Sequence, residues 1–417
     1  MLRYPMNLIA QLAVEARSRV LFVVLDGIGD VAVGGRTPLE AANTPNMDAL
    51  AEEASLGLST PVAPGVAPGS GPGHLALFGY DPLHYSVGRG VLSALGIGLD
   101  LASNEVAARG NFATLAGDGT VSDRRAGRIP TALNEQLIAR LQEEIRRIED
   151  VDVRLYTEAE YRFVLVLSGP GLGGKVRDTD PGRVGLAPLP ATPLTETPED
   201  AKTARVLNEF IRRATQVLHE LPEARRHTPP PNTVLVRGVD RLPDMPRFGE
   251  ITKMRAGAVA VYPMYRGVAR LVGMELLPID LSGTGERTPA KLDACRRHAR
   301  EYDYIYFHVK KTDSYGEDGD FEGKVSVIEE FDRSLPELLE AFEPDVVLIT
   351  GDHSTPVPLR AHSWHPLPVL LRGPHVRRDG RRFTEANCRA GSLGHVRHVD
   401  LLPLVMANAG RLARFGA

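Results

Sequence analysis

The sequence predicts an α/β protein whose core is a mostly parallel sheet flanked by helices, with a smaller α/β domain inserted into it. Three observations favour this class. Continuous runs of β-branched residues and leucine, typical of parallel strands buried on both faces, occur near both ends of the chain. Helical patterns separate these runs, as in βαβ units. The length of 417 residues exceeds that of one simple domain, so a second domain or an insertion is expected.

The first predicted strand is the run from Val20 to Leu25, within "RVLFVVLDG". It stops at Asp26 and Gly27, so Asp26 is expected at the carboxyl end of a strand, where ligands bind in open α/β sheets. The segment "TPNMDALAEEA" follows as a helix, with Thr44 as its cap and Pro45 in its first turn.

Similar strand runs recur late in the chain, at 302–310, 344–354 and 366–373. The segment "KVSVIEEFDRSLPELLEAF" predicts a helix between the first two of them. Strands that alternate with helices in this way indicate a parallel sheet.

The middle of the chain shows a different order of predicted strands, helices and loops. "ARGNFATL" and "YRFVLVLSG" resemble strands, and "NEQLIARLQEEIRRIED" is an amphipathic helix with one apolar stripe, formed by Leu137, Leu141, Ile145 and Ile148. A proline-rich loop, a second helix and a strand follow. We therefore expect a core made of residues 1–98 and 240–417 and an inserted domain at 99–239.

Composition excludes several classes of protein. A net charge of −4 and a pI near 6.3 argue against a nucleic-acid partner, which would require a basic face. Two cysteines, Cys295 and Cys388, suit neither a disulfide framework nor a thiolate metal site. No signal peptide and no run long enough to cross a bilayer is evident, so we expect a cytoplasmic protein with no membrane partner. The sequence carries no indication of oligomeric state.

Acidic and histidine residues follow several of the predicted strands. They lie in four segments: "LDG" with Asp26; "KKTDSYGEDGD" with Asp313, Glu317, Asp318 and Asp320; "TGDHSTP" with Asp352 and His353; and "AHSWHP" with His362 and His365. A single such residue is more often a helix cap or a turn residue. Several carboxylates at one sheet edge, however, would repel one another without cations. Together they predict a two-metal site.

Mixed carboxylate and imidazole ligands favour Mn²⁺, Zn²⁺ or Co²⁺ over an all-oxygen Mg²⁺ shell. Two such ions about 3.5–4 Å apart stabilise a transferring phosphoryl group. In the loop "PGSGPGH", the hydroxyl of Ser70 is the candidate acceptor of this phosphoryl group. A nearby cation and a helix N-terminus would favour its ionised form. Glycines at 69, 71 and 73 would leave room for a phosphate. For His74 a structural role is expected, and taken alone Ser70 could also be an ordinary turn residue.

These segments resemble the cofactor-independent phosphoglycerate mutases, in the archaeal-type branch of the alkaline phosphatase superfamily. The resemblance runs nearly end to end and is carried by "LDGIGD", "TPLEAANTPNMDALA", "PGSGPGHLALFGYDP", "GRGVLSALGIGLDL", "ARGNFATL", "DRRAGRI", "VRDTDP", "GVARLVGM", "HVKKTD", "GDHSTP", "AHSWHPLPVLL" and "GHVRHVDLLPLVMANAG". It implies an alkaline-phosphatase-like core and the interconversion of 3- and 2-phosphoglycerate, a step of glycolysis and gluconeogenesis. It also implies two divalent metal ions, with Mn²⁺ first and Mg²⁺, Zn²⁺ or Co²⁺ as alternatives, and no requirement for 2,3-bisphosphoglycerate.

The resemblance implies a phosphoserine mechanism in which Ser70 takes the phosphoryl group and the retained glycerate takes it back. One metal would be held by Asp26, Ser70, Asp352 and His353. The other takes an Asp and two His in the family, and Asp313 and His362 match two of these places. At the third place this chain has Glu317 where the family has histidine. Glutamate can bind a metal, and Asp318 or a water are the alternative ligands.

Phosphoglycerate carries a carboxylate and a phosphate, so guanidinium groups are expected to bind it. The candidates in the inserted domain are Asn111 and, in "DRRAGRI", Arg124, Arg125 and Arg128. The alternative is that these arginines are solvent-exposed turn residues with no role in binding. The family also has a basic residue near the transferring group. The segment "KMRAGAVAVYPMYRG" offers three candidates for it: Lys253, Arg255 and Arg266.

Two other functions fit the same residues. The first is a metal-dependent phosphatase or phosphotransferase that acts on another small hydroxy compound, in the manner of a homoserine kinase. The second is a catalytically weak family member, which the substitution at Glu317 would explain.

Overall fold

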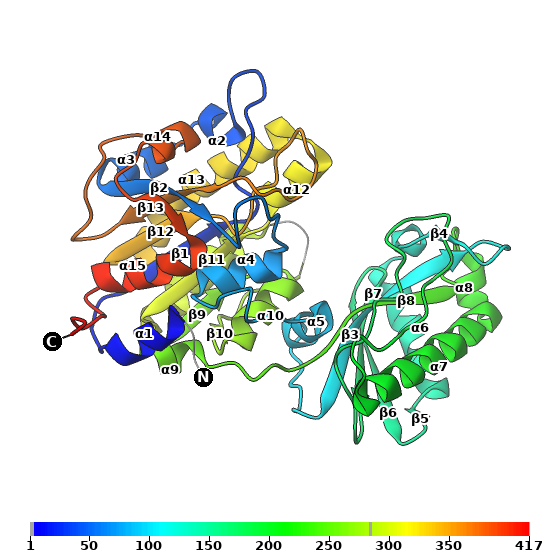
Figure 1. Ribbon diagram of the computed structural model, residues 1–417. Helices are drawn as coiled ribbons and strands as arrows, with labels where there is room; N and C mark the ends of the chain where they lie inside the picture. The colour runs from blue at the N-terminus through cyan, green and yellow to red at the C-terminus, as the bar shows by residue number, and fades with distance from the viewer. Residues whose placement is uncertain (1–3, 283–285, 417) are drawn as a thin grey trace. The chain divides into compact units, whose positions relative to one another are not determined.

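The computed structural model describes residues 4–282 and 286–416. The chain forms two compact units, one of residues 1–86 with 245–417 and one of residues 87–244 (Figure 1). The second unit thus begins earlier than the expected insert at 99–239, because helix α5 (Arg89–Gly96) belongs to it. Gly90 of this helix lies so close to strand β3 that a Cβ there would be 2.3 Å from the Cα of Ala108.

The first unit is built on a sheet with the strand order β10-β9-β11-β1-β12-β13-β2-β14. The run from β10 to β12 is parallel, and β13 is antiparallel to both of its neighbours. The mostly parallel sheet expected from the sequence is therefore confirmed. Its strands are β1 (Val20–Leu25), β2 (Ala54–Thr60), β9 (Ala256–Val259), β10 (Glu275–Leu276), β11 (Tyr304–Val309), β12 (Val346–Thr350), β13 (Leu367–Arg372) and β14 (Gly394–Arg397).

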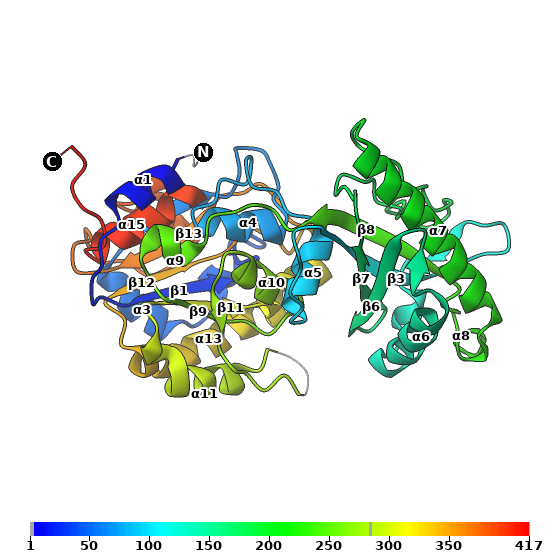
Figure 2. The same cartoon turned by 90° about the horizontal axis from the view of Figure 1, so that it is seen from below.

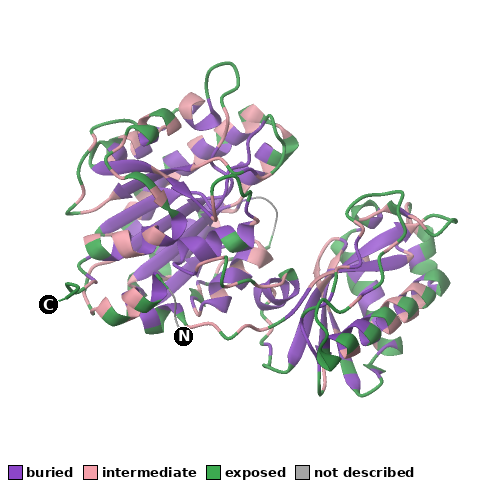
Figure 3. Cartoon of the chain, viewed as in Figure 1, coloured by how far each residue is buried: buried purple, intermediate pink, exposed green. Residues whose placement is uncertain are grey.

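Helices cover both faces of this sheet (Figure 2). On one face, Leu21, Val23 and Leu25 of β1 pack in a core with helices α2 (Pro38–Ala41), α3 (Pro45–Glu52), α11 (Thr288–His298) and α13 (Phe321–Phe342). The opposite face carries α1 (Met6–Leu12), α4 (Ser70–Leu77), α9 (Phe248–Thr252), α10 (Pro263–Leu271) and α15 (Leu401–Asn408). Strands β1, β11 and β12 are buried along their whole length, as a strand covered on both faces must be (Figure 3).

The second unit contains an antiparallel sheet in the order β4-β3-β7-β6-β5, with β8 paired to the other side of β3. Its strands are β3 (Glu105–Leu115), β4 (Val121–Asp123), β5 (Arg147–Ile148), β6 (Val151–Ala159), β7 (Arg162–Ser168) and β8 (Thr233–Arg241). Helices α6 (Thr131–Glu144) and α7 (Pro198–Glu220) pack with one face of this sheet in a single apolar core.

The amphipathic helix expected around residues 134–150 ends sooner than its apolar stripe suggests. Helix α6 stops at Glu144, so Ile145 lies just beyond it and Ile148 lies in strand β5. Both isoleucines remain buried in the same core, which explains why the apolar pattern continues past the helix. Within residues 4–282 and 286–416, no helix combines the length and the apolar character needed to cross a bilayer.

Candidate active site

The ends of three parallel strands bring the predicted acidic residues together. Asp26 directly follows β1, and Asp352 lies two residues beyond β12. Asp313 lies in helix α12 (Lys311–Asp318), which begins just after β11. The three strands are in register up to these ends, with Leu25 opposite Val309 and Val24 opposite Thr350. The expected convergence at one sheet edge is therefore present.

The first cluster consists of Asp26, Asp352, His353 and Ser70. The Nε2 atom of His353 lies 3.2 Å from a carboxylate oxygen of Asp26 and 3.2 Å from one of Asp352. It also lies 3.1 Å from the Oγ of Ser70. The side chains of Asp26, Asp352 and His353 are fully buried. This arrangement places the serine hydroxyl beside an imidazole nitrogen that also faces two buried carboxylates.

The second cluster consists of Asp313, His353 and His362. The Nε2 of His362 lies 3.5 Å from an oxygen of Asp313, and the rings of His353 and His362 stack with centroids 3.6 Å apart. In each cluster the candidate ligand atoms of the acids and histidines lie within 4.8 Å of one another. His353 belongs to both clusters, so the two candidate sites are adjacent.

The donor set fits divalent cations. Among residues 4–282 and 286–416, the Oδ1 of Asp26 and the Oδ2 of Asp352 are buried and find no hydrogen-bond partner. An unpartnered buried carboxylate oxygen is costly, so such groups in native proteins are paired or bind metals. Because both oxygens face the same imidazole nitrogen, a metal ion bound by all three would remove this cost.

Lys310 stands between the two clusters, and sequence reasoning did not single it out. Its ammonium lies 3.3 Å from Asp26 Oδ2 and donates a hydrogen bond to Asp313. Burial disfavours this charge, yet the two carboxylates hold the pKa of Lys310 well above its ordinary value. The only signal in the sequence was its place, three residues before Asp313 in "HVKKTD".

Both carboxylates beside Lys310 are ionised. Burial alone would raise the pKa of Asp26, but Lys310 and the neighbouring imidazoles hold it well below its ordinary value. The pKa of Asp313 is lowered to about 2, because His362 and Lys310 outweigh its burial and the charge of Asp26. The hydrogen bond and charge of Asp313 in turn outweigh the burial of His362 and raise the pKa of that imidazole to about 9.

Glu317 lies beside the second cluster rather than within it. One oxygen is 3.9 Å from the Nε2 of His362, and the side chain is 55% exposed. Asp318, the alternative ligand, is exposed at the end of α12. Helix α12 therefore directs only Asp313 into the buried cluster, and a ligand role for Glu317 stays a prediction.

Ser70 is the first residue of helix α4, as the expected helix N-terminus beside it requires. The serine therefore sits at the positive end of that helix. Around Gly69 a Cβ would meet only Pro72, at 3.7 Å, which agrees with clearance for a ligand. A Cβ on Gly73 would instead lie 2.3 Å from the carbonyl oxygen of Asp352. The prediction that Gly73 makes room for phosphate is thus wrong, because the glycine lets α4 pack against the loop that carries Asp352.

The structure gives His74 a clear environment. Its Nδ1 lies 2.8 Å from the carbonyl oxygen of Ser70 and 3.2 Å from Asp352 Oδ2, and the side chain is fully buried. These contacts agree with the structural role expected for His74, since they link the start of α4 to a residue of the first cluster.

A buried ion pair between Lys324 and Asp30 connects two loops of the site, and neither residue was predicted from the sequence. The ammonium of Lys324, on α13, donates to Asp30 at 2.7 Å and to the carbonyl oxygens of Gly27 and Thr355 at 2.9 Å each. Asp30 also accepts from the backbone N–H of Val357. The pair thereby joins the segment after Asp26 to the segment after His353.

The basic residues proposed near the transferring group are separated by the structure. Arg255 directly precedes β9, so it lies at the amino end of a parallel strand, opposite to the edge that carries the clusters. There it pairs with Glu275 at 3.0 Å and stacks over Tyr302. Arg255 is therefore a wrong assignment. Lys253 ends α9 and is exposed, whereas Arg266 lies within α10, which follows the carboxyl end of β9.

The second unit has a sheet face lined by arginines. Across the strands, Arg109 pairs with Arg237 and Asn111 pairs with Arg162. The intervening positions, such as Phe112 and Phe163, belong to the apolar core on the other face. Burial lowers the pKa of Arg109 to about 10. The charges of nearby arginines also lower this pKa, whereas the charge of Glu158 raises it. The Nε of Arg109 and the Oδ1 of Asn111 are buried and have no hydrogen-bond partner in the part of the chain that the structure describes.

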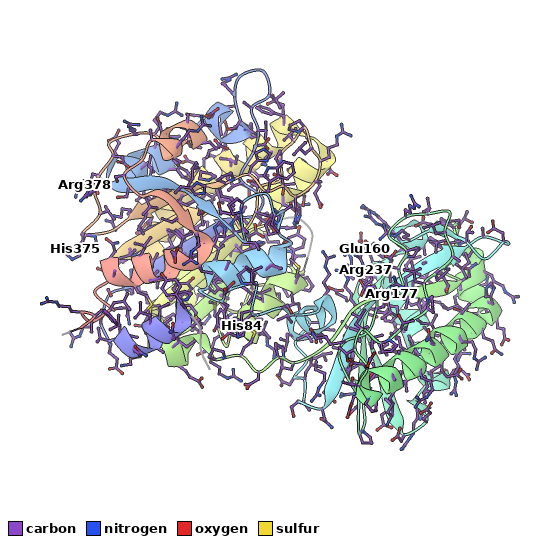
Figure 4. The ribbon with its side chains drawn as sticks, in the orientation of Figure 1. His84, Glu160, Arg177, Arg237, His375 and Arg378 are labelled. Carbon is purple, nitrogen blue, oxygen red and sulfur yellow. The ribbon has the colours of Figure 1, made fainter. Side chains whose placement is uncertain are left out.

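Among the candidates in this unit, Asn111 lies on that arginine-lined face. Arg124 is engaged by Asp180 through two hydrogen bonds of 2.8 Å, and Arg237 lies 3.7 Å from the same carboxylate. Arg125 and Arg128 are exposed. Figure 4 labels Arg177 and Arg237 in this unit. The sequence signal that we missed is an arginine alternating with apolar residues, as in "ARGNF", "YRFVLV" and "VLVRG".

A buried serine among carboxylates and imidazoles, at the carboxyl edge of a parallel sheet, is typical of enzymes that transfer phosphoryl groups. A family model described as 2,3-bisphosphoglycerate-independent phosphoglycerate mutase matches residues 51–223. A Thermus thermophilus protein named as a probable enzyme of this kind is 54% identical over 410 residues, which cover 98% of each chain. The chain belongs to the family of 2,3-bisphosphoglycerate-independent phosphoglycerate mutases.

Further relatives agree with this membership. An Aquifex aeolicus protein of the same probable function is 46% identical and covers 99% of this chain and 100% of its own. Among solved structures, a Pyrococcus horikoshii protein matches with a TM-score of 0.82 and 33% identity, covering 96% and 99% of the two chains. A cofactor-independent phosphoglycerate mutase from Thermoplasma acidophilum matches with a TM-score of 0.68 and 30% identity, covering 94% and 100%.

Proposed function

We propose that this chain interconverts 3-phosphoglycerate and 2-phosphoglycerate through a phosphorylated Ser70. The observation that carries the proposal is the position of Ser70 Oγ, 3.1 Å from His353 Nε2. The same nitrogen lies 3.2 Å from a carboxylate oxygen of Asp26 and 3.2 Å from one of Asp352. Family membership supports the same reaction.

The first metal site would use Asp26, Ser70, Asp352 and His353, and the second would use Asp313 and His362 with Glu317 beside them. Mn²⁺ suits this mixture of carboxylates and imidazoles, with Mg²⁺, Zn²⁺ and Co²⁺ as alternatives. When bound, such ions favour the ionised serine and neutralise charge on the phosphoryl group. No 2,3-bisphosphoglycerate enters this reaction.

The reaction consists of two displacements at phosphorus. The Oγ of Ser70 bonds to phosphorus as the bond to O3 of the glycerate breaks, and O3 takes up a proton. The glycerate turns without leaving, its 2-hydroxyl bonds to phosphorus as the bond to Ser70 breaks, and the proton of that hydroxyl is released. The N-terminus of α4 and the ammonium of Lys310 favour negative charge at this point.

Residues 87–244 are proposed to bind the anionic groups of the substrate. The crowded guanidinium groups of Arg109, Arg162 and Arg237 repel one another, and an anion would relieve that repulsion. Unpartnered polar atoms on Arg109 and Asn111 support this assignment.

An assay of both possible products tests the proposal. The purified chain is incubated with 3-phosphoglycerate and Mn²⁺, and 2-phosphoglycerate is measured through enolase while free phosphate is measured separately. We expect 2-phosphoglycerate without stoichiometric phosphate release. Rapid phosphate release with no 2-phosphoglycerate would instead identify a phosphatase, and turnover of neither kind would identify a weak family member.

A further inference from the structure

One fully buried hydroxyl touches both clusters of the site. Thr355 lies two residues after His353 and is 0% exposed. Its Oγ1 is 2.6 Å from the Oδ1 of Asp313 and 3.0 Å from the Nδ1 of His353. Asp313 belongs to the second cluster only, whereas His353 also faces Ser70 in the first.

The direction of these two hydrogen bonds follows from the protons available. The carboxylate of Asp313 can only accept, so the single proton of the threonine hydroxyl goes to its Oδ1, 2.6 Å away. Thr355 Oγ1 then has only lone pairs left for its second partner. The Nδ1 of His353 must therefore carry a proton and donate it to Oγ1.

A proton on Nδ1 leaves the Nε2 lone pair of a neutral His353 free. This is the atom that lies 3.1 Å from Ser70 Oγ and 3.2 Å from oxygens of both Asp26 and Asp352. The other tautomer would block the same atom with a proton. The hydroxyl therefore presents the ring nitrogen in the form that a metal requires, as outer partners of metal-binding histidines do.

The backbone holds Thr355 firmly enough for this role. Its N–H donates to the carbonyl oxygen of Gly29 at 3.1 Å, and its own carbonyl oxygen accepts from Lys324 at 2.9 Å. Helix α12 passes so close that a Cβ on Gly316 would lie 2.4 Å from that carbonyl oxygen. Contacts on three sides therefore fix the position of the hydroxyl.

We propose that Thr355 is a positioning residue, whose hydroxyl holds His353 in the Nδ1–H tautomer and couples the ligands of the two metal sites. The inference rests on the two-metal centre proposed above and does not depend on the identity of the substrate.

Metal binding by the full-length chain tests the role of the hydroxyl. Free Mn²⁺ is followed by electron paramagnetic resonance while it is titrated into wild type, Thr355→Val, Thr355→Ser and the control Thr252→Val. Valine keeps the shape of threonine without its hydroxyl, and serine keeps the hydroxyl. Thr252 is a fully buried threonine of α9 whose hydroxyl bonds only backbone groups of its own segment.

We expect wild type, Thr355→Ser and Thr252→Val to bind two ions with similar affinity. Thr355→Val should bind at least one of them about tenfold more weakly or worse, which is the usual effect of removing an outer partner of a metal ligand. A Thr355→Val variant that binds both ions as wild type does would overturn the proposal. So would a folded Thr355→Ser as weak as Thr355→Val, because the methyl group would then matter and not the hydroxyl.

Nitrogen-15 spectra of the histidines give a second readout that needs no stable valine variant. In Zn²⁺-loaded wild type and Thr355→Ser, we expect a slowly exchanging proton on Nδ1 of His353. A wild-type ring that carries its proton on Nε2 contradicts the proposal directly. If wild type binds fewer than two ions, the metal centre itself fails and this inference falls with it, whatever the mutase assay gives.

Discussion

The polar clusters of the two units have opposite chemistry. At the sheet edge of the first unit, Asp26, Asp313 and Asp352 converge, and two of their buried oxygens have no hydrogen-bond partner. On the sheet of the second unit, Arg109 and its arginine neighbours crowd together, and a buried guanidinium nitrogen is unpartnered. The first is rich in buried carboxylates, which metal ions would bind, and the second is rich in guanidinium groups, which an anion would bind.

The two clusters also differ in burial. The side chains of Asp26, Asp352 and His353 are fully buried, whereas those of Arg162 and Arg237 are 34% and 29% exposed. A substitution among the acids and histidines of the first unit should therefore affect metal binding and the chemical step. A substitution among the arginines of the second unit should mainly affect the capture of substrate.

Removing the nucleophile should have the largest effect. Ser70→Ala is expected to lower mutase kcat by roughly a thousandfold or more, because the proposed mechanism requires the serine oxygen to carry the phosphoryl group. The measurement is the enolase-coupled assay, with circular dichroism to show that the variant is folded. Ser55→Ala, which alters a buried serine bonded to the carbonyl oxygen of Arg377, is the control. Residual activity within tenfold of wild type would refute Ser70 as the nucleophile.

The second prediction compares two acids on helix α12. Asp313→Asn should weaken Mn²⁺ binding at one site by about a hundredfold, since it removes a buried charge from the ligand cluster. Glu317→Gln should weaken binding by less than about tenfold, because this side chain is 55% exposed and lies 3.9 Å from His362. Isothermal titration of both variants measures the difference. An equal or larger effect at Glu317 would make it a full ligand.

The third prediction concerns the arginines of the second unit. Arg237→Ala should raise KM for 3-phosphoglycerate by roughly tenfold and leave Mn²⁺ binding unchanged, because a charge-assisted bond to substrate is lost. Arg140→Ala, at an exposed arginine of α6 paired only with Glu143 in its own helix, should change neither quantity. Steady-state kinetics measures KM, and metal titration measures Mn²⁺ affinity, so the two experiments distinguish an effect on substrate binding from one on metal binding. Weaker metal binding in Arg237→Ala would break the division of roles.

The smallest effect is expected on stability, at a buried acid outside both clusters. Desolvation raises the pKa of Glu385 to about 7, although Thr37 donates a hydrogen bond to it. The folded chain therefore keeps a proton that the unfolded chain releases above about pH 4.5, and stability falls as pH rises from there to about 7. Glu385→Gln should remove that fall.

Denaturant unfolding of wild type and Glu385→Gln at pH 5 and pH 8 measures this change. The variant should gain stability relative to wild type on going to pH 8. If the difference in unfolding free energy between variant and wild type is the same at pH 5 and pH 8, the pKa of Glu385 is not raised in the folded chain, and this prediction is wrong.

Much of the two metal-ligand clusters was predictable because their acidic residues follow strands. Asp26, Asp313 and Asp352 each come soon after a continuous apolar run, and parallel strands end at one edge. The same rule would have excluded Arg255, which precedes its strand. Arg255 was a candidate only because the resembled family has a basic residue in this segment.

The supporting residues could not be predicted in the same way. Lys310, Thr355 and Lys324 each have at least one partner that is distant in sequence. These partners are Asp26, Asp313 and Gly27, respectively. Nothing local distinguishes these residues from an exposed lysine or a turn threonine. The arginines of the second unit were hidden for another reason, because their role depends on the register that places Arg109 opposite Arg237.

The phosphorylation state of Ser70 during turnover tests the account most directly. The chain is mixed with 3-phosphoglycerate and Mn²⁺, quenched in acid within milliseconds, digested and analysed by mass spectrometry. The account predicts phosphate on Ser70 of wild type and none on Ser70→Ala. Steady production of 2-phosphoglycerate with no phosphate on Ser70 at any quench time would contradict it.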